Sequence, residues 1–320
     1  MALLSVRDLC VSMGRVQPLD RISLDLDKGQ ILGVVGESGS GKSLTAMAIM
    51  GLLPLMGGRI SSGTVKFGGT ELVGLAEPAY RALRGQRLAL ITQNPMTSLD
   101  PMIKVGAQVD QVATLHLGLS DVAAKARTLD LLQQLRIPDA ATVYHQYPHQ
   151  MSGGMKQRIV IAMALAGDPD LIIADEPTTA LDVTIQAQII QILVDLVHSR
   201  GLALMLITHD MGVVAQACDK VVVLYAGRVA ESNTVHDIFA QPSHPYTRAL
   251  IACIAQTGQV RGSLKGIPGV VPGVGDYASG CRYHPRCDHA QTPCQSDVPA
   301  LRDWGRGLVA CHFPTCSDHG

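Results

Sequence analysis

The sequence predicts an α/β fold organised around a mainly parallel sheet, and two observations support that prediction. Short apolar, β-branched runs alternate with stretches of helical periodicity along most of the chain, as expected when helices connect parallel strands. One run, residues 31–35, leads into the glycine-rich loop GESGSGKS at 36–43 and then into a helix-like stretch at 44–53. A strand, a glycine-rich loop and a helix in this order are typical of a phosphate-binding site.

The other elements follow from the same two periodicities. Residues 22–26 alternate apolar and polar side chains, which predicts a half-buried strand in an antiparallel portion that precedes residue 88. Residues 57–69 are rich in glycine and turn formers, with strand pieces around 64–67. Further strands are expected at 88–91, 171–174, 203–207, 221–225 and 229–231, and helices at 120–135, 183–197, 211–217 and 247–254.

Composition and charge exclude several classes of protein. The 320 residues are 47% hydrophobic and 17% charged, which indicates a filled core rather than a disordered chain. The net charge is −1 and no run is rich in lysine or arginine, so nucleic-acid binding is not supported. The first residues lack the pattern of a signal peptide, and no stretch approaches the ~18 uninterrupted apolar residues of a membrane span. We expect a soluble, cytosolic protein that reaches a membrane only through partners.

The loop at 36–43 fits the P-loop pattern Gly-x-x-x-x-Gly-Lys-Ser. Its glycines let backbone N–H groups turn inward around phosphate oxygens, and the following helix adds its positive N-terminal end. Lys42 is expected to reach the β- and γ-phosphates of ATP, and the Ser43 hydroxyl to ligate Mg²⁺. A glycine-rich turn that happens to contain lysine is the alternative, which the flanking strand and helix disfavour. The expected nucleotide-binding residues are Gly36, Ser38, Gly39, Ser40, Gly41, Lys42, Ser43 and Leu44.

Two carboxylates follow the fully apolar run at 171–174. Asp175 and Glu176 therefore emerge at the C-terminal end of a buried strand, where α/β sheets place their ligands. Asp175 fits the Mg²⁺-coordinating aspartate of a nucleotide site. The alternative is a pair of acids that cap a loop, which the P-loop elsewhere in the chain disfavours. A second cluster of N–H groups suited to an anion is predicted at 152–154 (SGG), which also opens a helix-like stretch.

Four motifs occur in a fixed order: GESGSGKS at 36–43, MSGGM at 151–155, ADEP at 174–177 and THD at 208–210. In this order and spacing they resemble the ATP-binding subunits of ABC transporters over roughly the first 240 residues. The resemblance implies an ABC-type P-loop NTPase domain with a mixed sheet and a helical signature subdomain at about 95–165. It also implies a head-to-tail dimer, in which the signature of one subunit caps ATP held by the P-loop of the other. The signature residues would be Ser152, Gly153, Gly154 and Met155.

The same resemblance implies further roles. Glu176 would polarise or deprotonate the attacking water, and His209 would be the switch histidine that contacts the γ-phosphate. Gln93 would be the Q-loop glutamine, which touches Mg²⁺ or water and senses the membrane partner. A single glutamine or histidine after a strand is ordinarily structural, so both assignments depend on the family context. Asp182, in the ALD stretch 180–182, would belong to the D-loop that crosses the dimer interface.

Two positions depart from the commonest family pattern. Met13 falls near the position where an aromatic side chain usually stacks on adenine. Methionine packs on a purine face but stacks less strongly, so the departure bears on nucleotide affinity rather than on hydrolysis. Met155 stands where glutamine is commoner in the signature, and methionine also occurs there in peptide and nickel importer subunits.

The composition changes after about residue 241, which predicts a division into a domain at 1–240 and an extension at 241–320. Residues 258–275 are rich in glycine, proline and valine, and indicate a linker or a loosely packed arm. Five of the eight cysteines follow in the last forty residues. A reducing compartment argues against disulfides, which leaves a [4Fe–4S] cluster, zinc or unligated thiols. Cys10, Cys218 and Cys253 have apolar or helical surroundings and are expected to be small core residues.

The tail resembles the C-terminal extension of oligopeptide and dipeptide importer ATPases, including the HPY stretch at 244–246. The resemblance implies a [4Fe–4S] cluster in some members, with zinc as the alternative metal. It also implies a homologous ATPase subunit in a heterodimer, two membrane permeases and a periplasmic peptide-binding protein as partners, and a peripheral location on the cytoplasmic face of the bacterial inner membrane. The expected metal ligands are Cys281, Cys287, Cys294 and Cys311, with Cys316 as a possible replacement for Cys311.

Three other functions compete with peptide import. A nickel importer would share the ATPase core, but the four-cysteine tail favours peptides. A soluble ABC protein of the DNA-repair type would need a long coiled coil between P-loop and signature, and one of the ribosome type would need two cassettes; neither is present. An iron–sulfur redox sensor with a passive nucleotide domain is disfavoured by Glu176 and His209.

Overall fold

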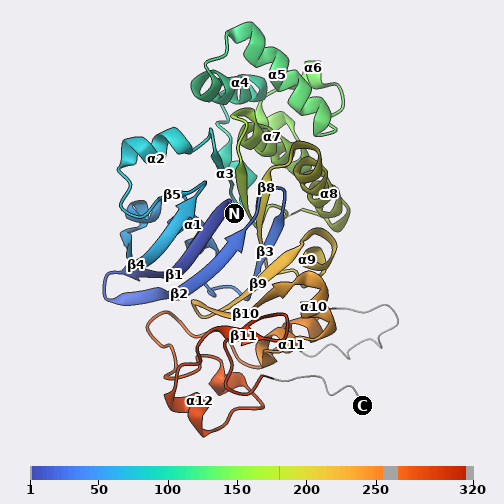
Figure 1. Ribbon diagram of the computed structural model, residues 1–320. Helices are drawn as coiled ribbons and strands as arrows, with labels where there is room; N and C mark the ends of the chain where they lie inside the picture. Colours follow the sequence, from blue (N-terminus) through green and yellow to red (C-terminus); the bar gives the residue numbers. More distant parts are fainter. Residues whose placement is uncertain (1, 180, 255–265, 315–320) are drawn as a thin grey trace. The chain divides into compact units, whose positions relative to one another are not determined.

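Figure 1 shows the computed structural model of the chain, which describes residues 2–179, 181–254 and 266–314. The chain forms two compact units. One comprises residues 1–27, 31–74 and 207–320, and the other comprises residues 28–30 and 75–206. The expected domain boundary at residue 240 stays a prediction, because these units divide the chain at other positions. Among the described residues, no helix has the length and apolar character needed to cross a membrane.

The first unit contains a four-stranded antiparallel sheet with the strand order β2-β1-β4-β5. The predicted strand at 22–26 is the end of a longer strand. The segment expected to hold only strand pieces at 64–67 is instead one continuous strand, because it pairs with β1 along that strand's whole length and so satisfies its backbone. The bounds are β1 Leu4–Met13, β2 Val16–Leu26, β4 Gly58–Phe67 and β5 Thr70–Glu71.

The same unit carries the strand that precedes the P-loop. β3 (Ile31–Val35) is buried at every residue and runs parallel to β9 (Lys220–Tyr225), and β9 forms the predicted hairpin with β10 (Arg228–Thr234). The helix expected at 44–53 is shorter, because Gly51 adopts a positive φ and ends it. The helices are α1 Lys42–Ile49, η1 Leu53–Met56, α9 Met211–Ala217, α10 Val235–Ala240 and α11 Pro245–Ala252.

The described part of the tail is folded against this unit. Its hairpin, β11 (Arg302–Trp304) and β12 (Gly307–Val309), extends the sheet through β12, which pairs antiparallel with β10. η3 (His284–Arg286) and α12 (Thr292–Ser296) precede the hairpin, and Figure 1 shows β11 next to β10 and α11.

An aromatic cluster joins the tail to the core. Tyr283 is 5% exposed, and its ring lies 5.1 Å from that of Tyr225 and 5.2 Å from that of Tyr246. The aromatic rings therefore anchor the segment that follows the expected arm at 258–275. Of that arm, the structure describes residues 266–275. Of the three cysteines expected in the core, Cys10 is buried and Cys218 half-buried, but Cys253 is exposed.

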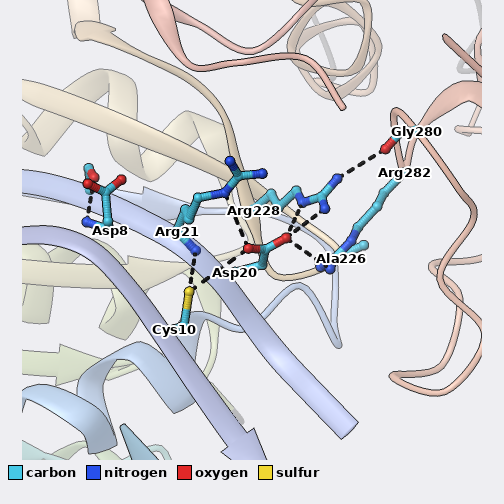
Figure 2. Close-up of polar contacts among 9 residues, drawn as sticks. Asp8, Cys10, Asp20, Arg21, Ala226, Arg228, Gly280 and Arg282 are labelled. Carbon is cyan, nitrogen blue, oxygen red and sulfur yellow. Dashed lines mark hydrogen bonds and ion pairs between the residues drawn. The ribbon is translucent and has the colours of Figure 1, made fainter. Parts of the chain in front are cut away.

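A second link between tail and core is a cluster of arginines around one carboxylate (Figure 2). Two nitrogens of Arg228 donate to Oδ2 of Asp20 at 2.6 and 2.8 Å, and its third donates to the Gly280 carbonyl at 3.0 Å. Arg282 donates to the Ala226 carbonyl and lies 3.4 Å from Asp20. Burial alone would raise the pKa of Asp20, but the hydrogen bond from Arg228 and the nearby guanidinium charges bring that pKa below its usual value.

The second unit combines strands with a group of helices. β6 (Leu88–Ile91) runs parallel to β7 (Leu171–Asp175), and β8 (Ala203–Thr208) lies beside β7, as the apolar runs predict. In Figure 1 the green helices α4, α5 and α6 lie together with α7. Four of these helices were not expected individually: α2, α3, α4 and α6. The bounds are α2 Glu77–Leu83, α3 Pro95–Ser98, α4 Val105–Leu117, α5 Asp121–Gln134, α6 Ala140–Tyr144, η2 Pro148–Gln150, α7 Gly153–Ala166 and α8 Val183–Arg200.

Asp20→Asn should destabilise the protein by about 3 kcal/mol at neutral pH, because it leaves the partly buried guanidiniums of Arg228 and Arg282 without a counter-charge. The folded-state pKa of Asp20 lies below the unfolded-state value, so its stabilisation is present above the unfolded pKa and is lost as the pH falls through the folded pKa. Thermal unfolding measured from pH 7 to pH 2 should therefore show a smaller acid-induced loss of stability in the variant. An identical acid limb in both proteins would contradict this account.

Candidate functional site

The P-loop begins at the C-terminal end of the buried strand β3. Gly36, Gly39 and Gly41 have φ angles of 152°, 81° and 103°, which side chains other than glycine rarely adopt. At Gly36 the space is closed as well, since a Cβ atom there would overlap the carbonyl oxygen of Leu224 on β9. The loop can therefore follow this path only with glycine at position 36.

Lys42 is the first residue of α1 and is 5% exposed. Its ammonium donates to the carbonyl oxygen of Gly36 at 2.8 Å and to that of Glu37 at 3.0 Å. The side chain of Lys42 thus folds back over the P-loop and contacts its first two residues. Ser43 is exposed and Ser40 is buried, with the Ser40 carbonyl accepting the N–H of Gly227 at 2.9 Å.

In the other unit, the acidic pair lies at the end of β7. Asp175 is the last residue of the strand and is 7% exposed. Glu176 has a φ of 46°, a left-handed conformation that costs a non-glycine residue about 1–2 kcal/mol. Such strain is common at functional positions.

Two donors orient the carboxylate of Glu176. Gln93 Nε2 donates to Glu176 Oε2 at 3.0 Å, and Thr179 Oγ1 donates to the same oxygen at 2.9 Å. The structure therefore brings together two of the three expected catalytic residues. Thr179 was not expected from the sequence, where a threonine after DEP has no distinguishing signal.

The signature motif opens α7. Ser152 is the N-cap, and its hydroxyl accepts the N–H of Met155 at 3.3 Å. A Cβ atom at Gly154 would lie 2.7 Å from Cγ2 of Ile185 on α8, so glycine permits the two helix starts to approach closely. Asp182 caps α8 by accepting the Ile185 N–H at 2.9 Å. Within the expected D-loop, residue 180 lies outside the described residues.

Two further candidates belong to the first unit. His209 is exposed between β8 and α9, next to Asp210, which caps α9. Met13 is half-buried at the end of β1, where it pairs with Val16.

The P-loop, His209 and Met13 belong to the first unit, whereas Gln93, Asp175, Glu176 and the signature belong to the second. The roles expected for all of these residues in nucleotide binding and hydrolysis stay predictions.

The four cysteines of the expected metal site line one small cavity of about 10 Å³, together with His244 and other residues. Burial and the proximity of the other thiols raise the pKa of Cys281 and Cys287, and burial raises that of Cys311 to about 11. Among the described residues, no three His, Cys, Asp or Glu side chains form a group that could hold a metal ion. The cluster and zinc are thus not confirmed, and Cys316 lies outside the described residues.

A cavity of about 370 Å³ lies at the arginine cluster of Figure 2 rather than at the P-loop. Asp20, Arg228 and Arg282 contribute to its lining, and their charged groups are already bonded to one another and to backbone carbonyls. We therefore assign these contacts to the attachment of the tail and not to nucleotide binding.

Comparison with known proteins identifies the class. Residues 19–179 match the family described as ABC transporter, and residues 230–294 match the family described as oligopeptide/dipeptide transporter, C-terminal region. Among solved structures, the dimeric ATP-binding cassette MJ0796 in a post-hydrolysis state with ADP and Pi is similar, with a TM-score of 0.64, 25% identity, and coverage of 72% of this chain and 98% of that chain. The cbiO1 protein of Clostridium perfringens, part of an ABC transporter complex, has a TM-score of 0.67, 25% identity, and coverage of 75% and 91%.

The mixed fold, the P-loop and these matches define an ABC-type nucleotide-binding domain, and the chain is an ABC transporter ATPase. The dipeptide transport ATP-binding protein DppD of Escherichia coli is 46% identical over 319 residues, which cover 98% of this chain and 97% of that protein. The oligopeptide transport ATP-binding protein OppD of Salmonella typhimurium is 44% identical over 317 residues, covering 98% and 94%. The chain belongs to the dipeptide/oligopeptide family of ABC transporter ATP-binding proteins.

Gly36→Ala should abolish ATP binding and lower the midpoint of thermal unfolding, because the new methyl group must displace β9 or the loop itself. Gly39→Ala is the matched control: its φ is also positive, but nothing lies within 4 Å of the added atom, so only the backbone cost of about 1–2 kcal/mol applies. Thermal unfolding and equilibrium binding of a fluorescent ATP analogue measure both effects. Equal behaviour of the two variants would contradict the assigned close contact.

Proposed function

We propose that this chain hydrolyses ATP with Glu176 as the residue that activates water, and that hydrolysis powers the import of dipeptides or oligopeptides. The observation that carries the proposal is the orientation of the Glu176 carboxylate by Gln93 and Thr179 directly after the buried aspartate at the end of β7. A carboxylate held in this way is ready to accept a proton from a water molecule.

The chemistry assigns a separate task to each group. Lys42 leaves its loop carbonyls to bind the β- and γ-phosphates, which neutralises part of their charge. The water oxygen attacks the γ-phosphorus, its proton passes to Glu176, and the bond to the bridging oxygen breaks to release ADP. The residues proposed to hold Mg²⁺ are Ser43, Gln93 and Asp175, and the ion when bound would stabilise charge on the phosphate oxygens.

The signature supports a role in a dimer. Ser152 and Gly153 are exposed at the start of α7, so their N–H groups and the helix dipole are available to an anion from another subunit. We propose that they contact ATP bound by a homologous ATPase subunit, as the dimeric state of the similar cassette suggests. Two permeases would hold this pair at the cytoplasmic face of the membrane and receive peptide from a periplasmic binding protein. The match at 230–294 favours peptide over nickel as cargo.

We also propose that Cys281, Cys287, Cys294 and Cys311 hold one [4Fe–4S] cluster. What supports this is the donor set: four soft ligands that line a single cavity. The cavity of about 10 Å³ is smaller than a cluster of four irons, so the segments that carry these cysteines would have to move apart to hold one. Cys281 and Cys311 lie in loops, Cys287 follows η3, and Cys294 lies in α12.

Glu176→Gln should reduce ATP turnover by at least about a hundredfold, because the amide cannot accept the proton, while ATP binding persists. Lys42→Ala should instead weaken ATP binding. Steady-state phosphate release and equilibrium ATP binding separate the two effects. The cargo is identified by a second experiment, which measures uptake of labelled dipeptide and of Ni²⁺ into vesicles that contain the copurified membrane partners. A wild-type rate of ATP turnover in Glu176→Gln would refute the proposal that Glu176 activates water.

Protein purified without oxygen should be brown and carry about four irons per chain. Cys281→Ser should bleach it and lower the iron content, while ATP binding is retained. Cys253→Ser is the matched control, since Cys253 is exposed and does not line the cavity. Stoichiometric zinc without visible absorbance, or a brown protein that Cys281→Ser leaves unchanged, would rule the cluster out.

A further inference from the structure

Glu37, inside the P-loop, is bonded to the C-terminal part of the chain. Arg286 Nη1 donates to Glu37 Oε2 at 2.8 Å, and Arg286 Nη2 donates to Glu37 Oε1 at 3.0 Å, across 249 residues of sequence. The Arg286 side chain is 7% exposed and that of Glu37 is 28% exposed. A two-pronged, largely buried pair of this kind is among the stronger polar contacts in proteins.

The backbone of Glu37 is also bonded to the C-terminal extension. Its N–H donates to the hydroxyl of Tyr246 at 3.0 Å, and Tyr246 is fully buried among the aromatic rings. The Tyr246 N–H in turn donates to Nδ1 of His244 at 3.0 Å, and the His244 N–H donates to Glu231 at 2.8 Å. The tyrosine is therefore a fixed acceptor, because its ring and its backbone are both constrained.

Arg286 is itself held by several groups. Its Nε donates to the Pro268 carbonyl at 2.7 Å, and its Nη2 also lies 3.3 Å from the Gly269 carbonyl. Its Nη1 lies 3.4 Å from the Tyr225 hydroxyl. The guanidinium thus connects the arm before the cysteines, the core strand β9 and the P-loop in one network.

The carbonyl oxygen of Glu37 accepts from Nζ of Lys42, the proposed nucleotide-binding lysine, at 3.0 Å, and from the Ser40 N–H at 3.2 Å. Side chain, N–H and carbonyl of one loop residue are therefore all engaged, the first two by the tail. We propose that the C-terminal extension sets the path of the P-loop through Arg286 and Tyr246, and that Arg286 is a positioning residue for ATP binding. The inference rests on the proposed ATP site at Lys42.

These bonds preorganise the P-loop for its ligand. Phosphate binding requires several backbone N–H groups of the loop to point at one place, and a loop fixed before binding loses less conformational entropy when the ligand arrives. Loss of the Arg286–Glu37 pair frees the exposed stretch at 38–39 to adopt other conformations. We expect the Kd for ATP to rise roughly tenfold, because the cost of ordering one or two side chains on binding is about 1.4 kcal/mol, which is tenfold in Kd.

The test compares Arg286→Gln and Glu37→Gln in the full-length chain by equilibrium ATP binding and thermal unfolding. Each variant should raise the Kd roughly tenfold, and the double variant should raise it no further, because both substitutions remove the same pair. Arg282→Gln is the matched control: it also detaches a tail arginine from the core, at Ala226 and Asp20, but does not touch Glu37. It should lower the unfolding midpoint and leave the Kd unchanged.

Three results would overturn the inference: an unchanged Kd in either Glu37→Gln or folded Arg286→Gln, additive effects in the double variant, or an equal rise in Kd for Arg282→Gln. If Arg286→Gln fails to fold, Glu37→Gln still decides, since it alters the loop and leaves the tail intact. Lys42→Ala separates the two proposals. A wild-type Kd in that variant would refute the ATP site itself, whereas a loss there with unchanged Kd in Glu37→Gln would refute only the positioning role.

Discussion

The close approach of Gly36 to the Leu224 carbonyl is the constraint on which the candidate site depends. It fixes where the chain leaves β3, and the loop that follows can then place Lys42 against the carbonyls of Gly36 and Glu37. On its other side the loop is bonded to Tyr246 and Arg286. The P-loop is thus fixed by the sheet at its first residue and by the tail at its second.

These contacts give the C-terminal extension a structural role. Tyr283 packs with Tyr225 and Tyr246, and Arg228 bonds both Asp20 and the Gly280 carbonyl. The tail therefore folds on the nucleotide-binding unit by apolar and ionic contacts, whether or not its cysteines hold metal. The sequence-based interpretation gave the tail a metal site and a likeness to peptide importers, and it predicted no contact between the tail and the P-loop.

The sequence was a good guide to elements with a strong local signal. Residues 171–175 form the predicted buried strand because every side chain is apolar up to the aspartate, and Ser120 caps the predicted helix α5. The helix α4 was missed because Gly106 and polar residues interrupt its apolar stripe, and glycine is needed there for the close approach of Tyr144. The Glu37–Arg286 pair had no sequence signal, since 249 residues separate its members and neither belongs to a periodic pattern.

The most direct measurement is the hydrogen exchange of the P-loop amides in the full-length chain without nucleotide. The Glu37 N–H donates to a buried hydroxyl, so the account predicts exchange far slower than that of the exposed Ser38 and Gly39. Tyr246→Phe should bring the Glu37 rate close to theirs in a protein that remains folded. A Glu37 amide that exchanges as fast as its two neighbours in the wild-type protein would contradict the claim that the tail holds the loop.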